Sequence, residues 1–388
     1  MKKNFCLFSL FVGLSLSACA GRGAAAEVTS VGGNDVSTDK QLSIGNVQRV
    51  ARVTGEPLPG EEQLYAPNHT GLKYDVYGTD LGIMWQIKGN HIGLFFGDTN
   101  GAGFVPMKGG GNGSNWRSNV LAFSSDTNLD DGLTIDSMLT DATGKAREVC
   151  AGGKANPQVY QTSIPTSAIH ANGLECVHYM NIYEWAAPHG RWLTNFSSLY
   201  TSADGGATWQ RQKAVTFGPD SHFSQIAYAK RDGWVYMLGT QAGRGDDAYL
   251  ARFREADLLH QSDYEFWNGD RKEWVRGDET AATPVIPAPV GEASLMWQQT
   301  FKRWIVTYQY DPLHDPLHLT NKPAIVYRTA TDLTQWGKPH VLLDSDDYPA
   351  LYCAFLHPLK DTGQQLWFIM SMWGPYDTYL MRADLSWK

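Results

Sequence analysis

The stretch SADGGATW, residues 202–209, matches the Asp-box pattern S-x-D-x-G-x-T-W. In this pattern the aspartate caps its own hairpin turn through backbone N–H groups, a glycine supplies a positive φ, and the tryptophan packs beneath the hairpin. Asp boxes are typical of hairpins in propeller-like sheets and say little about chemistry. We therefore expect a β-propeller with Asp204 in a structural role, and a degenerate second copy, ATDLTQW, at residues 330–336.

Short apolar or alternating runs, separated by Gly, Asp, Asn and Pro turns, fill the chain after residue 45. Such runs are typical of β-strands, and hardly any stretch has the 3.6-residue apolar period of a helix. Only EADLLHQS, residues 255–262, has the character of a brief helical turn. Five segments repeat one order of strands and turns, and they begin near Thr79, Ile164, His222, Glu292 and Pro349.

Each repeated segment is compatible with a four-stranded sheet, which cannot cover both of its faces alone. Radial stacking of such sheets buries both faces of each sheet against its neighbours and leaves only short, protected strand edges. The predicted fold class is therefore all-β, a five-bladed β-propeller over residues 46–388, with six blades as the alternative count. Because the last segment is short, we expect the strand near residues 47–55 to complete the final blade.

The composition is consistent with this fold and excludes other classes of protein. Of 388 residues, 43% are hydrophobic, 14 are Trp and 39 are Gly, which provides a large core with many turns. These values argue against a disordered chain and against a helical bundle. The formal net charge of −8 argues against a nucleic-acid partner. We expect the protein to be a monomer.

The N-terminus has the pattern of a lipoprotein signal peptide. Lys2 and Lys3 precede an apolar run too short to span a bilayer, and the run ends in LSAC, residues 16–19, which resembles a bacterial lipobox. We expect residues 1–18 to be the signal peptide and Cys19 to be lipidated; an ordinary secretion signal with an incidental Cys19 is the alternative. Residues 19–45 predict a lipidated flexible tether. The expected localisation is exported and lipid-anchored, at the outer membrane or cell surface if the cell is Gram-negative.

Three cysteines remain once the signal peptide and the lipidated position are set aside: Cys150, Cys176 and Cys353. An exported compartment permits a disulfide between Cys150 and Cys176, and three buried free thiols are the alternative. No CxxC pair or His/Cys cluster indicates a zinc site, so we expect no metal ligands.

Two aspartates interrupt strongly apolar surroundings. Asp80 lies in GTDLGIMW at the start of the first blade, and Asp98 lies in LFFGDTNG where an apolar strand ends. Their separation of 98 − 80 = 18 residues is typical of neighbouring strands in one hairpin. Two carboxyl groups in one cleft are the arrangement that protonates a glycosidic oxygen and attacks or stabilises the anomeric carbon. The alternative is that each aspartate simply caps a turn.

Further candidates follow the glycine-rich loop KGGGNGSN, residues 108–115. Trp116 offers a ring on which a furanose can stack, and Arg117 and Asn119 offer hydrogen bonds to its hydroxyls. The alternative is that the tryptophan belongs to the core and the arginine to a surface salt bridge.

Other polar residues stand in or before apolar strands. His178 and Asn195 are substrate-binding candidates, although a hydrogen-bonded core residue is the usual explanation for such positions. Glu292 opens the fourth segment, so we expect an inward-facing carboxylate that tunes a catalytic pKa or binds a hydroxyl. Trp297 and Trp373 are candidates for lining sugar subsites.

The blocks GTDLGIMW, GLFFGDTNG and WRSNVLAFSS, together with IPTSAI, HYMNIYEW and GEASLMW, resemble a bacterial family known as domain of unknown function 4185. That family is now glycoside hydrolase family 183, whose characterised members are endo-D-arabinanases. The resemblance runs from about Val50 to the C-terminus and implies a five-bladed propeller that cleaves D-arabinofuranosyl linkages within D-arabinan-type polysaccharides.

The resemblance also implies the residues and partners of the reaction. Asp80 and Asp98 fall on the catalytic pair, a general acid and a nucleophile or base, and no cofactor is implied. The expected partners are the polysaccharide substrate and, through the anchor at Cys19, a membrane. The alternative function is a non-catalytic propeller lipoprotein that binds glycans or anchors an envelope complex.

Overall fold

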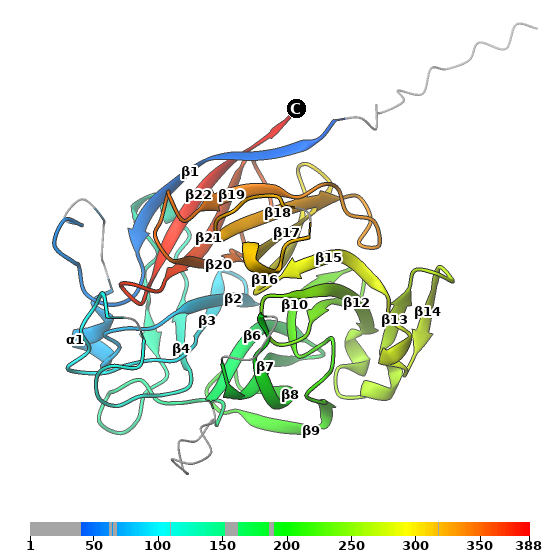
Figure 1. Ribbon diagram of the computed structural model, residues 1–388. Coiled ribbons are helices and arrows are strands. Elements are labelled where there is room, and N and C mark those ends of the chain that lie inside the picture. Colours follow the sequence, from blue (N-terminus) through cyan, green and yellow to red (C-terminus); the bar gives the residue numbers. More distant parts are fainter. Residues whose placement is uncertain are drawn as a thin grey trace, which may run out of the picture. The chain divides into compact units, whose positions relative to one another are not determined.

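The computed structural model describes residues 40–388 except 62–63, 65–67, 109, 152–161, 186–189 and 317. Residues 41–388 form one unit built from five antiparallel sheets, which are arranged around a common centre (Figure 1). This is the five-bladed β-propeller that the sequence predicts. The expected signal peptide, most of the tether and Cys19 lie outside the described residues.

The first three blades follow the order of the chain, and each successive strand pairs with the one before it except β15, which pairs with β12. The first blade contains β2 (Leu81–Lys88), β3 (His91–Phe96), β4 (Val120–Ser124) and β5 (Ser137–Met138). The second contains β6 (Thr162–Ala171), β7 (Leu174–Glu184), β8 (Leu193–Ser202) and β9 (Gln210–Phe217). The third contains β10 (Gln225–Arg231), β11 (Trp234–Thr240), β12 (Asp246–Arg254), β13 (Glu265–Asn268), β14 (Glu273–Arg276) and β15 (Pro284–Val290).

The third blade is larger than the predicted four strands, because β13 and β15 both pair with β12, and β14 pairs with β13. The fourth blade contains β16 (Ala293–Gln298), β17 (Arg303–Tyr310), β18 (Ala324–Ala330) and β19 (His340–Asp344). The fifth contains β20 (Leu351–Leu356), β21 (Gln365–Met372), β22 (Asp377–Trp387) and β1 (Leu42–Arg52).

Helices are short and lie in the connections. The described helices are α1 (Thr70–Tyr74) and the single-turn 3₁₀ helices η1 (Leu129–Asp131), η3 (Glu255–Asp257), η4 (Gln261–Asp263), η5 (Glu279–Ala281) and η6 (Pro312–His314). The brief helical turn expected at residues 255–262 is therefore present. None of the described helices has the length and apolar character needed to cross a bilayer.

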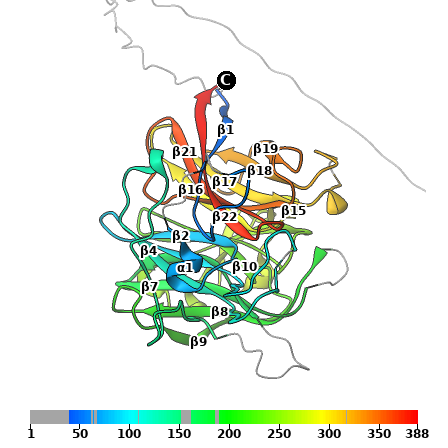
Figure 2. The ribbon, with the colours of Figure 1, turned by 90° about the vertical axis from the view of Figure 1, so that its left-hand side faces the viewer.

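The last blade is closed by the first strand of the chain, as predicted. β1 pairs antiparallel with β22, from Leu42 opposite Trp387 to Arg52 opposite Tyr379, and Figure 2 shows the two strands side by side. The predicted tether is too long at its C-terminal end, since residues 42–45 belong to β1. Leu42 and Ile44 are buried in the core of the neighbouring blades, which is why the strand begins so early.

The hydrophobic core is divided among the spaces between neighbouring blades. One cluster joins Phe95 of the first blade to Val177 of the second, and another joins Val235 of the third blade to Leu199 of the second. Because each sheet buries both faces against its neighbours, the inner strands can be apolar throughout. Their polar residues are then concentrated at the strand ends, where the functional site is expected.

The Asp box forms the hairpin expected of it. Asp204 accepts hydrogen bonds from the backbone N–H and the hydroxyl of Thr208, and Gly205 and Gly206 both have positive φ. The Trp209 indole donates to the Gly206 carbonyl and packs edge-on against Phe95 of the first blade. Asp204 is thus a structural residue that fixes the contact between two blades.

Candidate active site

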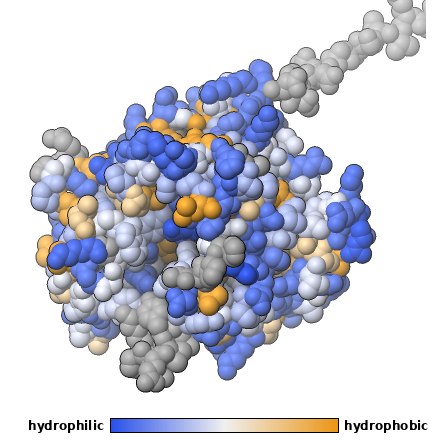
Figure 3. Space-filling model, viewed as in Figure 1, coloured by the Kyte–Doolittle hydropathy of each residue, from blue (hydrophilic) through white to orange (hydrophobic). Residues whose placement is uncertain are grey.

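A cavity of about 680 Å³ opens where the innermost strands of the five blades begin. Every blade contributes to its wall through the first residues of its inner strand or the residue just before it: Leu81, Ile164, Gln225, Glu292 and Leu351. Aromatic side chains add to this wall: Tyr352 comes from β20, and the surrounding loops contribute Trp116, Trp185, Trp192, Trp373 and Tyr376. The face of the molecule seen in Figure 3 is mainly hydrophilic, with apolar residues gathered in small patches.

Asp80 and Asp98 both line this cavity, as the 18-residue spacing predicts. They precede β2 and follow β3, and the two segments are held together by a 2.7 Å hydrogen bond between the hydroxyls of Thr79 and Thr99. The backbone of Gly97 also donates to the Asp80 carbonyl. The hairpin therefore delivers both carboxyl groups to one side of the cavity.

A β-bulge at the start of β2 sets the direction of Asp80. Leu81 has a φ of +70° and Gly82 a φ of +92°, and the register with β3 shifts between Leu81 and Ile83. A positive φ is uncommon for leucine, and bulges of this kind re-aim side chains next to active sites. The Ser371 hydroxyl on β21 accepts a hydrogen bond from the Leu81 N–H, which ties the bulge to the fifth blade.

The surroundings of Asp80 favour its protonated form. Burial is the main cause and the neighbouring Asp98 carboxylate adds to it, and together they raise the pKa of Asp80 to about 8. The Tyr352 hydroxyl opposes this by donating a 2.9 Å hydrogen bond to Oδ2. Overall the Asp80 residue is only half-buried, but its Oδ1 is covered and has no hydrogen-bond partner among the described residues. A carboxyl group in this position holds a proton at neutral pH.

Asp98 has a different environment. Its Oδ1 accepts a hydrogen bond of 2.7 Å from the Thr162 hydroxyl at the start of β6. A donated hydrogen bond stabilises the ionised form of a carboxyl group. The site therefore holds two neighbouring carboxyl groups with different surroundings.

Glu292 faces the cavity, as predicted, but an ion pair with an arginine balances its charge. Arg244, in the loop between β11 and β12, donates from Nε and Nη2 to both oxygens of Glu292 at 2.7–3.2 Å. Burial alone would lower the pKa of Arg244, and the Glu292 carboxylate outweighs burial and raises it. The guanidinium also faces the rings of Trp192 and Tyr352, each with its centroid 5.5 Å away.

Trp116 and Trp373 line the cavity, in agreement with the sequence analysis. Trp373 is 52% exposed and meets Tyr376 edge-on. Trp297 lies elsewhere, because it stands near the end of β16, at the opposite end of the inner strands, under the Arg231 guanidinium. The expectation that Trp297 lines the same sugar site is therefore wrong.

Arg117 and Asn119 do not line the cavity, which corrects the prediction for both. Arg117 is buried and donates to the carbonyls of Ala146 and Asp75. The Asn119 side chain is fully buried and makes four hydrogen bonds to backbone groups on neighbouring segments. Both residues are buried and use their polar atoms to hold loops in place, away from the cavity.

His178 and Asn195 are also placed away from the cavity. His178 is buried, donates from Nε2 to the Ser224 carbonyl at 3.2 Å, and packs against Phe217 and Tyr228. Burial lowers the pKa of His178 to about 3, so the ring is neutral. Asn195 is exposed and donates to the side chain of Asn181. Neither residue is positioned to bind a substrate in this cavity.

The three described cysteines are buried free thiols, which was the alternative to a Cys150–Cys176 disulfide, and that disulfide is not formed. Cys150 packs in the cluster that contains Val177, whereas Cys176 packs in the cluster that contains Leu199. Neighbouring residues of a strand point to opposite faces of a sheet, so Cys176 is directed away from the space that Cys150 occupies. Burial raises the pKa of both thiols.

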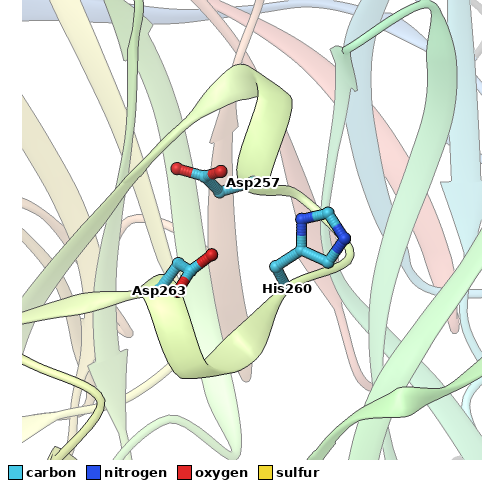
Figure 4. A group of neighbouring side chains, drawn as sticks. All are labelled: Asp257, His260 and Asp263. Atoms are coloured by element: carbon cyan, nitrogen blue, oxygen red, sulfur yellow. The ribbon is translucent and has the colours of Figure 1, made fainter.

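One group of possible metal ligands lies outside the cavity, on the 3₁₀ turns of the third blade. Asp257, His260 and Asp263 have ligand atoms within 4.8 Å of one another (Figure 4). Asp263 is paired with the Arg276 guanidinium at 2.6 Å, which already balances its charge. We assign no role to this group.

Several cavity residues were missed by the sequence analysis: Arg244, Tyr352, Tyr376, Gln225 and Gln309. Arg244 stands in an unremarkable Gly-rich turn, and its partner lies 292 − 244 = 48 residues away. Tyr352 is one of 18 tyrosines and reads as an ordinary strand residue. Only the closure of the ring brings these residues to Asp80.

Comparisons with known proteins place the chain in a family. A family model described as "Domain of unknown function (DUF4185)" matches residues 65–382. Notoamide biosynthesis cluster protein J of Aspergillus sp. (strain MF297-2) is 26% identical over 321 residues, which are 78% of this chain and 82% of that protein.

Solved structures share the fold at low sequence identity. A crystal structure from Bacteroides ovatus, whose description proposes a hydrolase, aligns over 80% of this chain and 86% of its own with 13% identity and a TM-score of 0.55. The catalytic domain of Coprinopsis cinerea GH62 alpha-L-arabinofuranosidase aligns over 89% of this chain and 97% of its own with 8% identity and a TM-score of 0.45. By the extent of the family match, this chain belongs to the DUF4185 family.

Proposed function

We propose that the chain is a glycoside hydrolase of family 183 that cleaves D-arabinofuranosyl linkages within D-arabinan-type polysaccharides. The observation that carries this proposal is the presence of Asp80 and Asp98 at one sugar-sized cavity, with the pKa of Asp80 raised to about 8. Family membership and the TDLG and FGDT blocks support the substrate class. The cavity volume falls in the range that holds small-molecule ligands.

Asp80 is the general acid in this proposal. It holds a proton at neutral pH and gives that proton to the glycosidic oxygen as the bond to the anomeric carbon breaks. The leaving chain departs as an alcohol, and Asp80 is left as a carboxylate that accepts the hydrogen bond from Tyr352. The same hydrogen bond therefore becomes stronger as the reaction proceeds.

Asp98 is the ionised partner. It either attacks the anomeric carbon to form a glycosyl ester, which water then hydrolyses, or it takes a proton from a water molecule that attacks directly. In the first route the product retains its anomeric configuration, and in the second the configuration inverts. Proton NMR of the first product formed distinguishes the two routes.

The aromatic residues supply the stacking surface for the sugar chain. Trp185 meets Trp192 edge-on at 5.0 Å near the second and third blades, and Trp373 meets Tyr376 beside the fifth. Sugar rings present C–H faces that pack on aromatic rings, so these pairs would hold sugar residues on two sides of the carboxyl groups.

The test is hydrolysis of a panel of D- and L-arabinans by the soluble domain, with products separated by chromatography. We expect oligosaccharides from D-arabinan with the wild type, and a loss of at least about 10²-fold with Asp80→Asn or Asp98→Asn. Asp232→Asn, on an exposed turn of the third blade, is the matched control and should retain full activity. Full activity in either cavity variant would reject the assignment of the pair.

The rival function is glycan binding without hydrolysis. Under that function the wild type would bind arabinan, measured by affinity electrophoresis, and leave its chain length unchanged. Asp→Asn variants of a hydrolase can also bind uncleaved substrate, so the distinguishing result is the chain length of arabinan after incubation with the wild type.

We also propose that the protein is exported and anchored through a lipid on Cys19. The motivation is the lipobox-like LSAC sequence after a short apolar run. Growth with a radiolabelled or alkyne-bearing fatty acid should label the wild type and leave Cys19→Ala unlabelled. Labelling of both proteins, or of neither, would contradict the anchor.

A further inference from the structure

The cavity wall formed by the third and fourth blades contains two buried amides. Gln225 is the first residue of β10 and Gln309 lies on β17, and both are at most 3% exposed. Both line the cavity, and the Oε1 atom of each has no hydrogen-bond partner among the described residues. A buried acceptor left without a donor is unfavourable, so these two oxygens point to a ligand that donates hydrogen bonds.

Arg244 belongs to the same wall. A Cβ atom built on Gly291 would lie 2.9 Å from Arg244 Cγ and 3.0 Å from Gln309 Cβ, so both side chains lie across the bare face of this glycine. Gln225 is joined to the residue before Arg244, because its Nε2 donates to the Gly243 carbonyl at 3.3 Å. We call Gln225, Gln309 and Arg244 the amide–guanidinium wall.

The wall offers both donors and acceptors. Arg244 uses Nε and Nη2 for Glu292, and its Nη1 donates to none of the described residues although the side chain is 31% exposed. A hydroxyl group donates one hydrogen bond and accepts others, and neighbouring sugar hydroxyls do so at fixed separations. The free donor of Arg244 beside the two amide oxygens matches that chemistry.

The charge of the wall distinguishes hydroxyls from anionic groups. The Arg244 charge is balanced by the bidentate contact with Glu292, and both amides are neutral. The Asp98 carboxylate, which lines the same cavity, adds negative charge, so a carboxylate, sulfate or phosphate on the ligand would be repelled.

We infer that the amide–guanidinium wall is a specificity-determining subsite, which binds a neutral sugar residue through its hydroxyls and excludes uronic acids and other anionic sugars. This inference rests on the proposed hydrolysis, and names the class of sugar that the same cavity accepts. The wall positions substrate, while Asp80 and Asp98 carry out the bond cleavage.

The test combines kinetics with binding. Gln309→Met and Gln225→Met keep the side-chain length and remove the amide, and Gln86→Met, on an exposed position of β2 outside the cavity, is the matched control. We expect each cavity variant to lose roughly ten- to hundredfold in kcat/KM on D-arabinan. Calorimetry in the Asp98→Asn background should show a comparable loss of affinity for neutral arabino-oligosaccharides. The melting temperature and the pH profile should follow those of the control.

The outcomes separate this inference from the proposed function. If the wild type cleaves D-arabinan and both Gln variants stay within twofold of it, the wall has no role in recognition. If the wild type cleaves no arabinan, the proposed substrate is wrong, and binding of neutral oligosaccharides against oligogalacturonates still tests the wall. Oligogalacturonate binding as tight as neutral binding would overturn the inference in either case.

Discussion

The Tyr352 hydroxyl donates a 2.9 Å hydrogen bond to Asp80 Oδ2, while the ring of the same tyrosine lies 5.5 Å from the Arg244 guanidinium carbon. One side chain thus contacts both the proposed acid and the ion pair of the third and fourth blades. A hydrogen bond to a carboxylate stabilises its ionised form, so Tyr352 limits how far burial raises the pKa of Asp80. The pH dependence of the enzyme should report this balance.

Activity should fall as the pH rises through about 8, because Asp80 then loses the proton that the leaving oxygen needs. Tyr352→Phe removes a donor from the ionised form, which raises the pKa of Asp80 further, so the midpoint of this fall should move upward by about one pH unit. The measurement is kcat/KM between pH 5 and 10. Tyr236→Phe, packed against Trp304 outside the cavity, should leave the midpoint unchanged. A downward move in Tyr352→Phe would contradict the proposed role of Asp80.

Asp80 should make the folded state less stable as the pH rises. Between the usual carboxyl pKa of 3.8 and the folded value of about 8, the folded protein keeps a proton that the unfolded chain releases, so stability falls through this window. Asp80→Asn has no such proton. The melting temperature of this variant minus that of the wild type should therefore increase from pH 4 to 8 and stay constant above pH 8. Differential scanning calorimetry at several pH values measures the difference.

Asp204→Asn is a control for that experiment, because the contribution of Asp204 to stability should have the opposite pH dependence. Hydrogen bonds from Thr208 lower the pKa of Asp204 to about 2, so its contribution to stability is present above pH 4 and lost as the pH falls toward 2. The melting temperature of Asp204→Asn should therefore lie below that of the wild type at neutral pH and approach it in acid. Parallel behaviour of the two variants would show that neither effect comes from these carboxyl groups.

Gly97→Ala should disable the site without unfolding the protein. A Cβ atom at position 97 would lie 2.3 Å from Asp80 Oδ1, so the carboxyl group has to move. Displacing a reacting group by about 1 Å costs on the order of 10²-fold in rate, and we expect a loss of that size in kcat. Gly218→Ala, where a Cβ would meet nothing within 4 Å, should behave as the wild type in the same assay. Equal activity of the two variants would place Asp80 outside the reaction.

The junction of the chain ends should be a centre of stability. The buried Arg52 of β1 donates to Asp377 of β22 at 2.6 Å and to the Tyr379 hydroxyl at 2.8 Å. Asp377→Asn leaves the arginine charge buried and only partly paired, which should lower the free energy of unfolding by about 3–5 kcal/mol in urea titrations. Glu273→Gln, in an exposed pair with Arg271, should cost at most about 1 kcal/mol. A similar small effect at Asp377 would show that the last blade is held by other contacts.

The fold was predictable because its signals are local and repeated. The Asp box, the regular punctuation by turns and the leftover strand near residues 47–55 lead to five blades with closure by β1. The placement of Asp80 and Asp98 followed for the same reason, since both belong to one hairpin. The two strands of a hairpin are adjacent in the sequence, so their pairing can be predicted without the rest of the chain.

The positions of the remaining site residues depend on contacts between blades, and no short stretch of the sequence indicates such contacts. His178 was expected at the site as a polar residue in an apolar strand, and Asn119 because it follows the glycine-rich loop, yet each forms hydrogen bonds with backbone groups of a neighbouring segment. Arg244 and Tyr352 were not predicted as site residues, because the partners that place them there are far away in the sequence. The bulge at Leu81 could not be predicted from the sequence either, because leucine rarely adopts a positive φ.

The pairing of β1 with β22 has a consequence for biosynthesis. The partner of β1 is β22, which is translated more than 300 residues later. Until β22 has been made, β1 has no native neighbour on that side and the fifth blade cannot be assembled. The ring therefore closes late, and the edge of β1 stays open to pairing with other strands until it does.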